Sequence, residues 1–191
     1  LQLSAGGPAP VILGQQETSS DALFFTDIRR FGRFLVTPAG DYRDLPTLHA
    51  MGPEPLGEQF TVPGFAAALQ GSVVAVKTYL LSQRPVAGLG NIYVDEALWR
   101  TGVHPLTPAA AVPAGRIPVL HQAIRDVLAE SIAAEGTTLS DYRTVKGSGG
   151  AFQERLQAYG RSGEPCLRCG TTMQRLVIGG RSTHFCPACQ R

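Results

Sequence analysis

The residues with the clearest chemistry in this 191-residue sequence are four cysteines near its C-terminal end. They form two C-x2-C pairs, Cys166 with Cys169 and Cys186 with Cys189, separated by sixteen residues. Each C-x2-C turn aims two thiolates at one point, and a hairpin between two such turns can complete a tetrahedron around zinc. Disulfides or a redox pair are the alternatives, but the sequence has no secretion signal and no βαβ pattern around the cysteines. We therefore expect one structural Zn2+.

The segment between the cysteine pairs has the pattern of a hairpin. Residues 173–178 and 182–185 predict two short strands, and Gly179-Gly180 forms a two-residue turn of the kind that permits positive φ. Arg181 then lies at the tip, and His184 is expected to be a strand residue because four thiolates already complete the metal shell. Since such a hairpin is too small to bury a core, its folding free energy should come from the metal.

A second candidate site is the segment Gly88-Leu89-Gly90-Asn91, which precedes a predicted amphipathic helix. Glycine allows close approach of the backbone, and the unpaired N–H groups at a helix start attract a phosphate. Lys77 on the preceding helix could add a positive charge to the same phosphate. A tight turn that merely packs two helices together is equally compatible with this short motif.

These residues need elements to position them, and the sequence predicts two kinds. Short β-prone runs at 11–13, 22–25 and 34–36 are separated by turn residues and suggest a small sheet. After residue 46 the pattern becomes helical. The predicted helices are 63–69, 76–82, 91–100 and 118–134, and the last has a core face of apolar residues at helical spacing, Leu120, Ile124, Val127, Leu128 and Ile132.

The net charge of +2 by itself implies no polyanionic partner, but its distribution is uneven. Residues 143–191 carry a charge of +6 and the remainder −4. Fifteen of the 17 basic residues are arginine, whose forked donors suit phosphate, although coding bias would give the same ratio. No run is long enough to span a membrane and no signal peptide opens the sequence, so a secreted or membrane-spanning protein is disfavoured.

Several motifs, in order over residues 23–191, resemble the formamidopyrimidine-DNA glycosylases of the Fpg/Nei family. The Arg-Arg-Phe-Gly and Asn-Ile-Tyr motifs are more similar to the Fpg branch than to the Nei branch. The matching segments are 27–32 (DIRRFG), 51–56 (MGPEPL), 86–99 with 102–105 (GVHP), 136–138 (GTT), Phe152 with 159–161 (YGR), and the cysteine segment through Gln190.

The resemblance implies an α+β multidomain fold. Residues 1–45 are expected to be the remnant of an N-terminal β-sandwich domain. Residues 46–158 would form a helix-two-turns-helix DNA-binding domain with a lesion loop, and residues 159–191 a zinc-finger hairpin.

The function implied by the resemblance is base-excision repair by a bifunctional glycosylase and AP lyase. Such an enzyme removes oxidised purines (8-oxoguanine, formamidopyrimidines) and nicks the abasic site. The family's N-terminal proline nucleophile and the adjacent glutamate have no counterpart at Leu1, so we expect a fragment that binds damaged double-stranded DNA without cleaving it. A non-catalytic zinc-containing DNA-binding protein is the alternative, and a Met-Pro-Glu start upstream of Leu1 would favour the enzyme. A zinc ribbon for protein contacts is a third interpretation, which predicts no affinity for DNA.

The resemblance also implies roles for individual residues. Arg29 and Phe31 would fill the hole left by an extruded base, although a strand with a surface arginine and a core phenylalanine is the alternative. Lys146 lies in a glycine-rich segment, 144–152, that either closes over the flipped base or is a plain linker. Arg181 would clamp phosphates; a proton-donor role suits it less, because an arginine with a pKa above about 12 is a poor acid. The implied DNA-binding residues are Arg29, Arg30, Phe31, Lys77, Asn91, Lys146, Arg161 and Arg181.

We further expect a monomer in the bacterial cytoplasm, associated with the nucleoid when bound to DNA and with no membrane partner.

Overall fold

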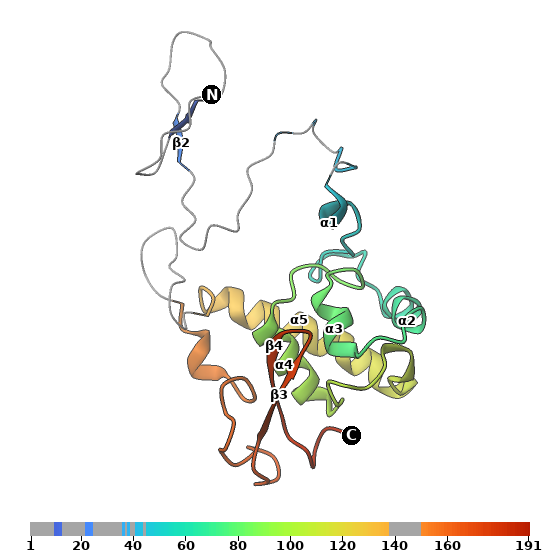
Figure 1. The fold of residues 1–191 in the computed structure, drawn as a ribbon, viewed down its shortest axis with the longest axis vertical. Coiled ribbons are helices and arrows are strands. Elements are labelled where there is room, and N and C mark those ends of the chain that lie inside the picture. The colour runs from blue at the N-terminus through green and yellow to red at the C-terminus, as the bar shows by residue number, and fades with distance from the viewer. Residues whose placement is uncertain are drawn as a thin grey trace. The chain divides into compact units, whose positions relative to one another are not determined.

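A computed structural model describes residues 10–12, 22–24, 36, 38, 41–43, 45–137 and 150–191 (Figure 1). The chain divides into two compact units, Leu1–Tyr42 and Arg43–Arg191. The predicted DNA-binding residues Arg29, Arg30, Phe31 and Lys146 lie outside the described residues.

The first unit contains two antiparallel strands. Strand β1 (Pro10–Ile12) pairs with β2 (Ala22–Phe24), and Pro10 lies opposite Phe24. These strands correspond to two of the three predicted β-prone runs. Of the third run, only Val36 is described, and it is not in a strand.

The second unit begins with helices. They are α1 (Pro46–His49), α2 (Val62–Gln70), α3 (Val76–Leu81), α4 (Asn91–Thr101) and α5 (Ile117–Ala133). Short 3-10 turns cover Ala109–Ala111, Ala114–Arg116 and Phe152–Arg155. The four predicted helices are confirmed within two residues at each end, whereas α1 was not predicted. Within the described ranges, no helix is both long and apolar enough to cross a membrane.

Local sequence explains where these helices start and stop. Thr61 caps α2 by accepting a hydrogen bond from the Gly64 N–H through its hydroxyl oxygen, and Pro63 occupies the first turn, where no donor is missed. Helix α4 ends at Gly102, whose φ of 69° is left-handed and therefore suits glycine.

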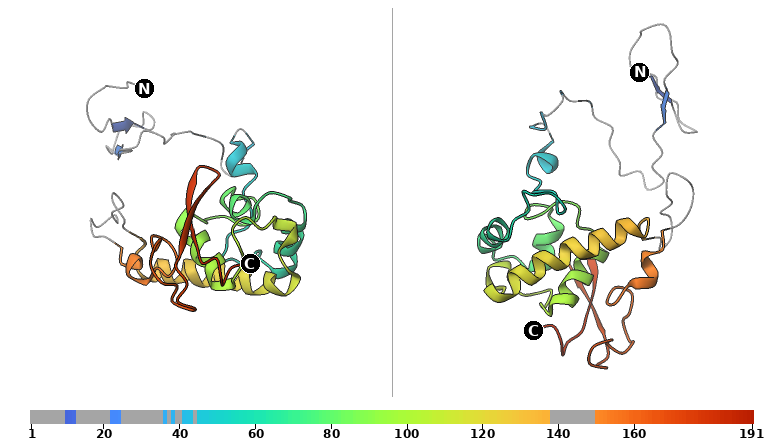
Figure 2. Two further views of the ribbon diagram at one scale, coloured as in Figure 1. Left: turned by 60° about the horizontal axis from the view of Figure 1, so that its bottom comes forward. Right: turned by 180° about the vertical axis from the view of Figure 1, so that it is seen from behind.

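The core of this unit lies between α4, α5 and the shorter helices. Leu98 of α4 and Leu120, Ile124 and Val127 of α5 are fully buried. In the view from behind (Figure 2, right), the yellow α5 crosses in front of the other helices. The prediction for Ile132 is wrong, because its side chain is 66% exposed. At helical periodicity Ser131, seven residues after Ile124, faces inward instead.

The C-terminal hairpin follows the predicted pattern. Strands β3 (Gln174–Ile178) and β4 (Arg181–Phe185) pair antiparallel, with Ile178 opposite Arg181. The two turn glycines between them, Gly179 and Gly180, have φ values of 57° and 74°, which match the tight turn that joins twisted strands. Strand β4 contacts α4, and Figure 1 shows the red hairpin lying beside this green helix.

Gly52 provides a test of the packing between the start of the unit and the residues after α3. Its N–H donates to the Gln83 carbonyl at 2.8 Å, and an added Cβ would lie 2.5 Å from the Arg84 carbonyl oxygen. We expect Gly52→Ala to destabilise the fold by about 1–3 kcal/mol, as overpacking against backbone does. Gly115→Ala is the matched control, since nothing lies within 4 Å of its added Cβ. Urea unfolding of both variants measures the difference, and equal stabilities would contradict this close packing around Gly52.

Candidate functional site

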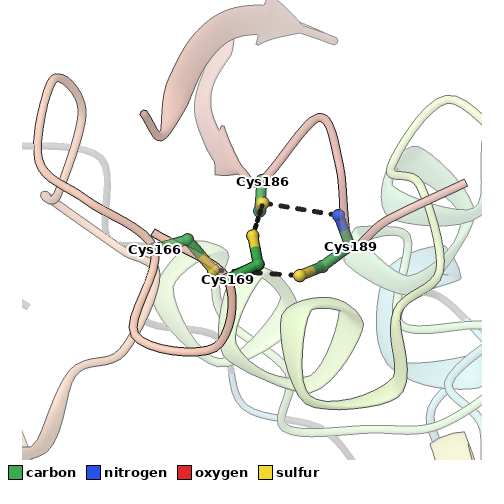
Figure 3. Close-up of side chains that lie close together, drawn as sticks. All are labelled: Cys166, Cys169, Cys186 and Cys189. Carbon is green, nitrogen blue, oxygen red and sulfur yellow. Dashed lines mark hydrogen bonds between the residues drawn. The ribbon is translucent and has the colours of Figure 1, made fainter. Parts of the chain in front are cut away.

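The four cysteines converge on one point at the base of the hairpin (Figure 3). Their sulfur atoms all lie within 4.8 Å of one another. The Sγ atoms of Cys169 and Cys186 are 3.5 Å apart, and those of Cys166 and Cys189 are 3.9 Å apart. A tetrahedral zinc ion with Zn–S bonds of about 2.3 Å requires sulfur separations of about 3.8 Å. The geometry therefore fits one structural Zn2+, as the spacing predicts.

The surroundings of these thiols already favour a thiolate on one side of the cluster. Hydrogen bonds from the hydroxyl and backbone of Thr171 lower the pKa of Cys169 to about 6. The interaction with Cys169, followed by burial and the other two cysteines, raises the pKa of Cys189 to about 12. Zinc binding displaces thiol protons, so metal affinity must fall as the pH is lowered.

Helix α4 contacts the cysteine cluster through its C-terminal end. Trp99 is buried against Cys166 and Cys186, and the guanidinium of Arg168 stacks 4.0 Å above the Trp99 ring. The buried side chain of Gln190 accepts from the Cys186 N–H and donates to the Val103 carbonyl just beyond α4. The metal site is thus fixed to the helical part of the unit.

A buried ion pair lies at the other end of the hairpin. Lys77 of α3 contacts the Asp95 carboxylate of α4 with 2.6 Å between Nζ and Oδ1, and both side chains are fully buried. The Lys77 ammonium also donates to the Ser182 carbonyl at 2.9 Å. Burial lowers the pKa of Lys77, and the charge of Asp95 opposes this shift.

The structure therefore corrects the phosphate-binding role predicted for Lys77. Its side chain has no exposed surface, and its hydrogen bonds go to Asp95 and to the backbone of β4. From the sequence alone the residue resembled a solvated lysine, because nothing in the local pattern shows that β4 covers it.

Glu96, the next residue of α4, forms a second buried contact with the C-terminal segment. Its carboxylate accepts hydrogen bonds from the backbone N–H groups of Gln157, Ala158 and Tyr159 at 2.8–3.1 Å. Three backbone donors replace the water that a buried carboxylate loses. Glu96 thereby fixes the segment that leads into the zinc finger.

The start of α4 lies next to the hairpin tip. Asn91 donates from Nδ2 to the Ser182 carbonyl at 2.9 Å, and the turn residue Gly179 packs near Thr78 of α3. Arg181 is exposed at this tip. The first N–H groups of a helix have no intrahelical partner. Gly90, which precedes α4, has no side chain that could cap them. The arrangement can accept an anion between a helix N-terminus and an arginine.

The predicted residues Asn91 and Arg181 are therefore brought together, whereas Arg161 lies elsewhere. Its guanidinium pairs with Glu164 at 2.8 Å and donates to the carbonyls of Gln157 and Pro165. Asp95 and Glu96 are site residues that the motifs of the sequence did not predict. The signal was available, because Asn91, Asp95 and Trp99 recur every four residues and mark a face of α4 distinct from its apolar core face.

Two segments of the chain match known family descriptions. Residues 51–143 match "Formamidopyrimidine-DNA glycosylase H2TH domain", and residues 163–191 match "Zinc finger found in FPG and IleRS". Together these segments make up more than half of the chain.

Curated relatives and solved structures agree with these matches. The chain is 48% identical over 177 residues to a formamidopyrimidine-DNA glycosylase of Deinococcus radiodurans and 49% identical over 170 residues to one of Thermus thermophilus. The alignments cover 90% and 88% of this chain, and the chain spans only 62% and 64% of these relatives.

The crystal structure of the Thermus thermophilus MutM (Fpg) protein superposes with a TM-score of 0.84 at 48% identity, covering 88% of this chain and 64% of that one. A complex between Lactococcus lactis Fpg and DNA containing an abasic site superposes with a TM-score of 0.71 at 42% identity, covering 78% and 55%.

The metal site yields the prediction that Cys169→Ser abolishes stoichiometric zinc binding and unfolds the hairpin. The helices should remain folded because they have their own apolar core. Val177→Ser, on an exposed position of β3, is the control that keeps all four ligands. Metal analysis and hydrogen exchange measure the two effects. A wild-type protein that contains no stoichiometric zinc when fully reduced would refute the site.

Proposed function

The chain belongs to the formamidopyrimidine-DNA glycosylase family, and from this we propose that the protein acts in DNA base-excision repair. The proposed activity is that of a bifunctional DNA glycosylase and AP lyase, which releases oxidised purines such as 8-oxoguanine and formamidopyrimidines and nicks the abasic site. Damaged double-stranded DNA is the proposed partner. Because the chain spans 62–64% of its curated relatives, the activity of the complete enzyme is inferred from them.

One observation carries the DNA-binding part of this proposal, namely the exposed Arg181 beside the N-terminus of α4. Strand β4 is held there by hydrogen bonds to the Ser182 carbonyl. An arginine fork and free helix N–H groups are both suited to a phosphate oxygen. Contacts of this kind position a duplex without reading its sequence. Arg181 and Asn91 are therefore the proposed phosphate contacts.

The remaining assignments follow the family. Residues 1–45 are proposed to belong to a β-sandwich domain, residues 46–158 to the DNA-binding domain and residues 159–191 to the zinc finger. Arg29 and Phe31 would enter the duplex beside the extruded base, Arg30 would contact DNA next to them, and Lys146 would lie near the flipped nucleotide. Arg161 is proposed to contact DNA only through donors that its local bonds leave free. A monomer in the bacterial cytoplasm is the proposed state.

A non-catalytic DNA-binding protein is the second candidate, and the burial of Lys77 favours it. Schiff-base chemistry needs an unprotonated amine against the sugar carbon, and the amine of Lys77 is enclosed in an ion pair. The printed sequence contains one other lysine, Lys146.

We predict that binding to duplex DNA is steeply salt-dependent and that Arg181→Ala lowers the slope of log K against log salt by about one unit. Arg191→Ala is the matched control. The two arginines lie at opposite ends of α4, because the Ser182 carbonyl contacts Asn91 whereas the Arg191 N–H donates to Gly102. Fluorescence anisotropy over a salt series measures both slopes. An unchanged Arg181→Ala slope would remove this residue from the interface.

We also predict that borohydride traps little covalent complex between a polypeptide of these 191 residues and DNA containing 8-oxoguanine or an abasic site. An ordinary lysine amine is overwhelmingly protonated near neutral pH, and Lys77 is buried. A Fpg from Thermus thermophilus, processed in parallel, is the positive control. Efficient trapping by the 191-residue polypeptide would mean that a nucleophile lies within it.

A further inference from the structure

The Ser182 carbonyl, directly after the proposed DNA-binding Arg181, receives two hydrogen bonds from the helical domain. One comes from Lys77 Nζ of α3 and the other from Asn91 Nδ2 of α4, each at 2.9 Å. The hairpin tip is therefore tied to two different helices through a single backbone oxygen. A carbonyl with both lone pairs occupied has little freedom to rotate.

Asp95 holds the other side of this arrangement. Its Oδ1 contacts Lys77 at 2.6 Å, and its Oδ2 accepts from the His184 N–H at 2.9 Å. The ion pair thus makes hydrogen bonds to β4 at two points, the carbonyl of Ser182 and the amide of His184. Both are backbone groups, so the pair fixes the path of the strand whatever side chains it carries.

The burial of this pair argues for a positioning role. Two charges without exposed surface lose their hydration, and an apolar pair of similar volume often gives equal or greater stability. What an apolar pair cannot supply is a donor for Ser182 and an acceptor for His184. Directional bonds to β4 are therefore the property that this ion pair adds.

We propose that Lys77 and Asp95 are positioning residues that set the direction of Arg181 toward DNA phosphate without touching DNA themselves. Lys77 acts through the Ser182 carbonyl, one residue from Arg181, and Asp95 acts through Lys77 and His184. The inference rests on the proposed DNA-binding function. It assigns to the buried pair an effect on affinity that passes entirely through Arg181.

A double-mutant cycle tests this route. The affinity for a duplex with an abasic-site analogue is measured for wild type, Lys77→Met, Arg181→Ala and the double variant. Lys77→Met is expected to weaken binding about tenfold in the wild-type background and to have no further effect when Arg181 is alanine. An equal loss in both backgrounds would overturn the inference, because Lys77 would then act independently of Arg181.

Controls separate positioning from general stability. Arg100→Met breaks the Arg100–Glu130 pair between α4 and α5, which does not involve the hairpin. It should lower the melting temperature without an Arg181-dependent loss of affinity. If Lys77→Met fails to fold, Lys77→Met with Asp95→Asn removes both charges of this pair and keeps an acceptor for the His184 N–H. This neutral variant should bind zinc normally and still show the Arg181-dependent loss, and full wild-type affinity would overturn the inference.

Hydrogen exchange at the His184 amide distinguishes failure of this inference from failure of the proposed function. Wild-type protein that does not bind DNA at any salt concentration would refute the DNA-binding function without any variant. The positioning role is then judged by exchange alone. Asp95→Leu should accelerate exchange at His184 relative to Arg100→Met, and unchanged exchange would overturn the inference.

Discussion

Helix α4 carries two adjacent buried carboxylates, and the attachment of the zinc finger (residues 159–191) to the helices depends on both. Asp95 binds β4, whereas Glu96 binds the backbone of residues 157–159 that leads into the zinc finger. Successive residues of a helix point about 100° apart, so the two acids reach two different segments from one place. A buried carboxylate is tolerated only where donors satisfy it, which makes both attachments specific.

Zinc and α4 have separate tasks in this arrangement. The four thiolates bring the ends of the hairpin together, but a metal ion held only by the finger's own cysteines does not fix where the finger lies on the helices. Trp99 and Gln190 supply that attachment at the cysteine end, and Asp95 supplies it near the tip. The hairpin is therefore held at both ends along α4. This attachment fixes the backbone that carries the exposed Arg181 at the tip.

Features encoded by local spacing were predictable from the sequence. The cysteine spacing, the Gly179-Gly180 turn and the four main helices all depend on residues close together in the chain. The burial of Lys77 was not predictable, because it depends on a strand more than a hundred residues away. Ser131 rather than Ile132 faces inward because Tyr93 of α4 receives its hydroxyl, a partner that apolar periodicity does not reveal. The short α1 carries no amphipathic pattern.

The contacts of individual basic side chains also determine how much of the positive charge in the C-terminal region is available to phosphate. Residues 143–191 carry a charge of +6, yet the guanidinium of Arg161 pairs with Glu164 and that of Arg168 stacks on Trp99. These local contacts stabilise the zinc finger and leave Arg161 and Arg168 fewer free donors for phosphate. Lys77, likewise, is paired with Asp95 in a buried ion pair. Residues 143–191 can therefore neutralise fewer phosphates than their net charge suggests. The geometry at the hairpin tip matters more for DNA binding than the total charge does.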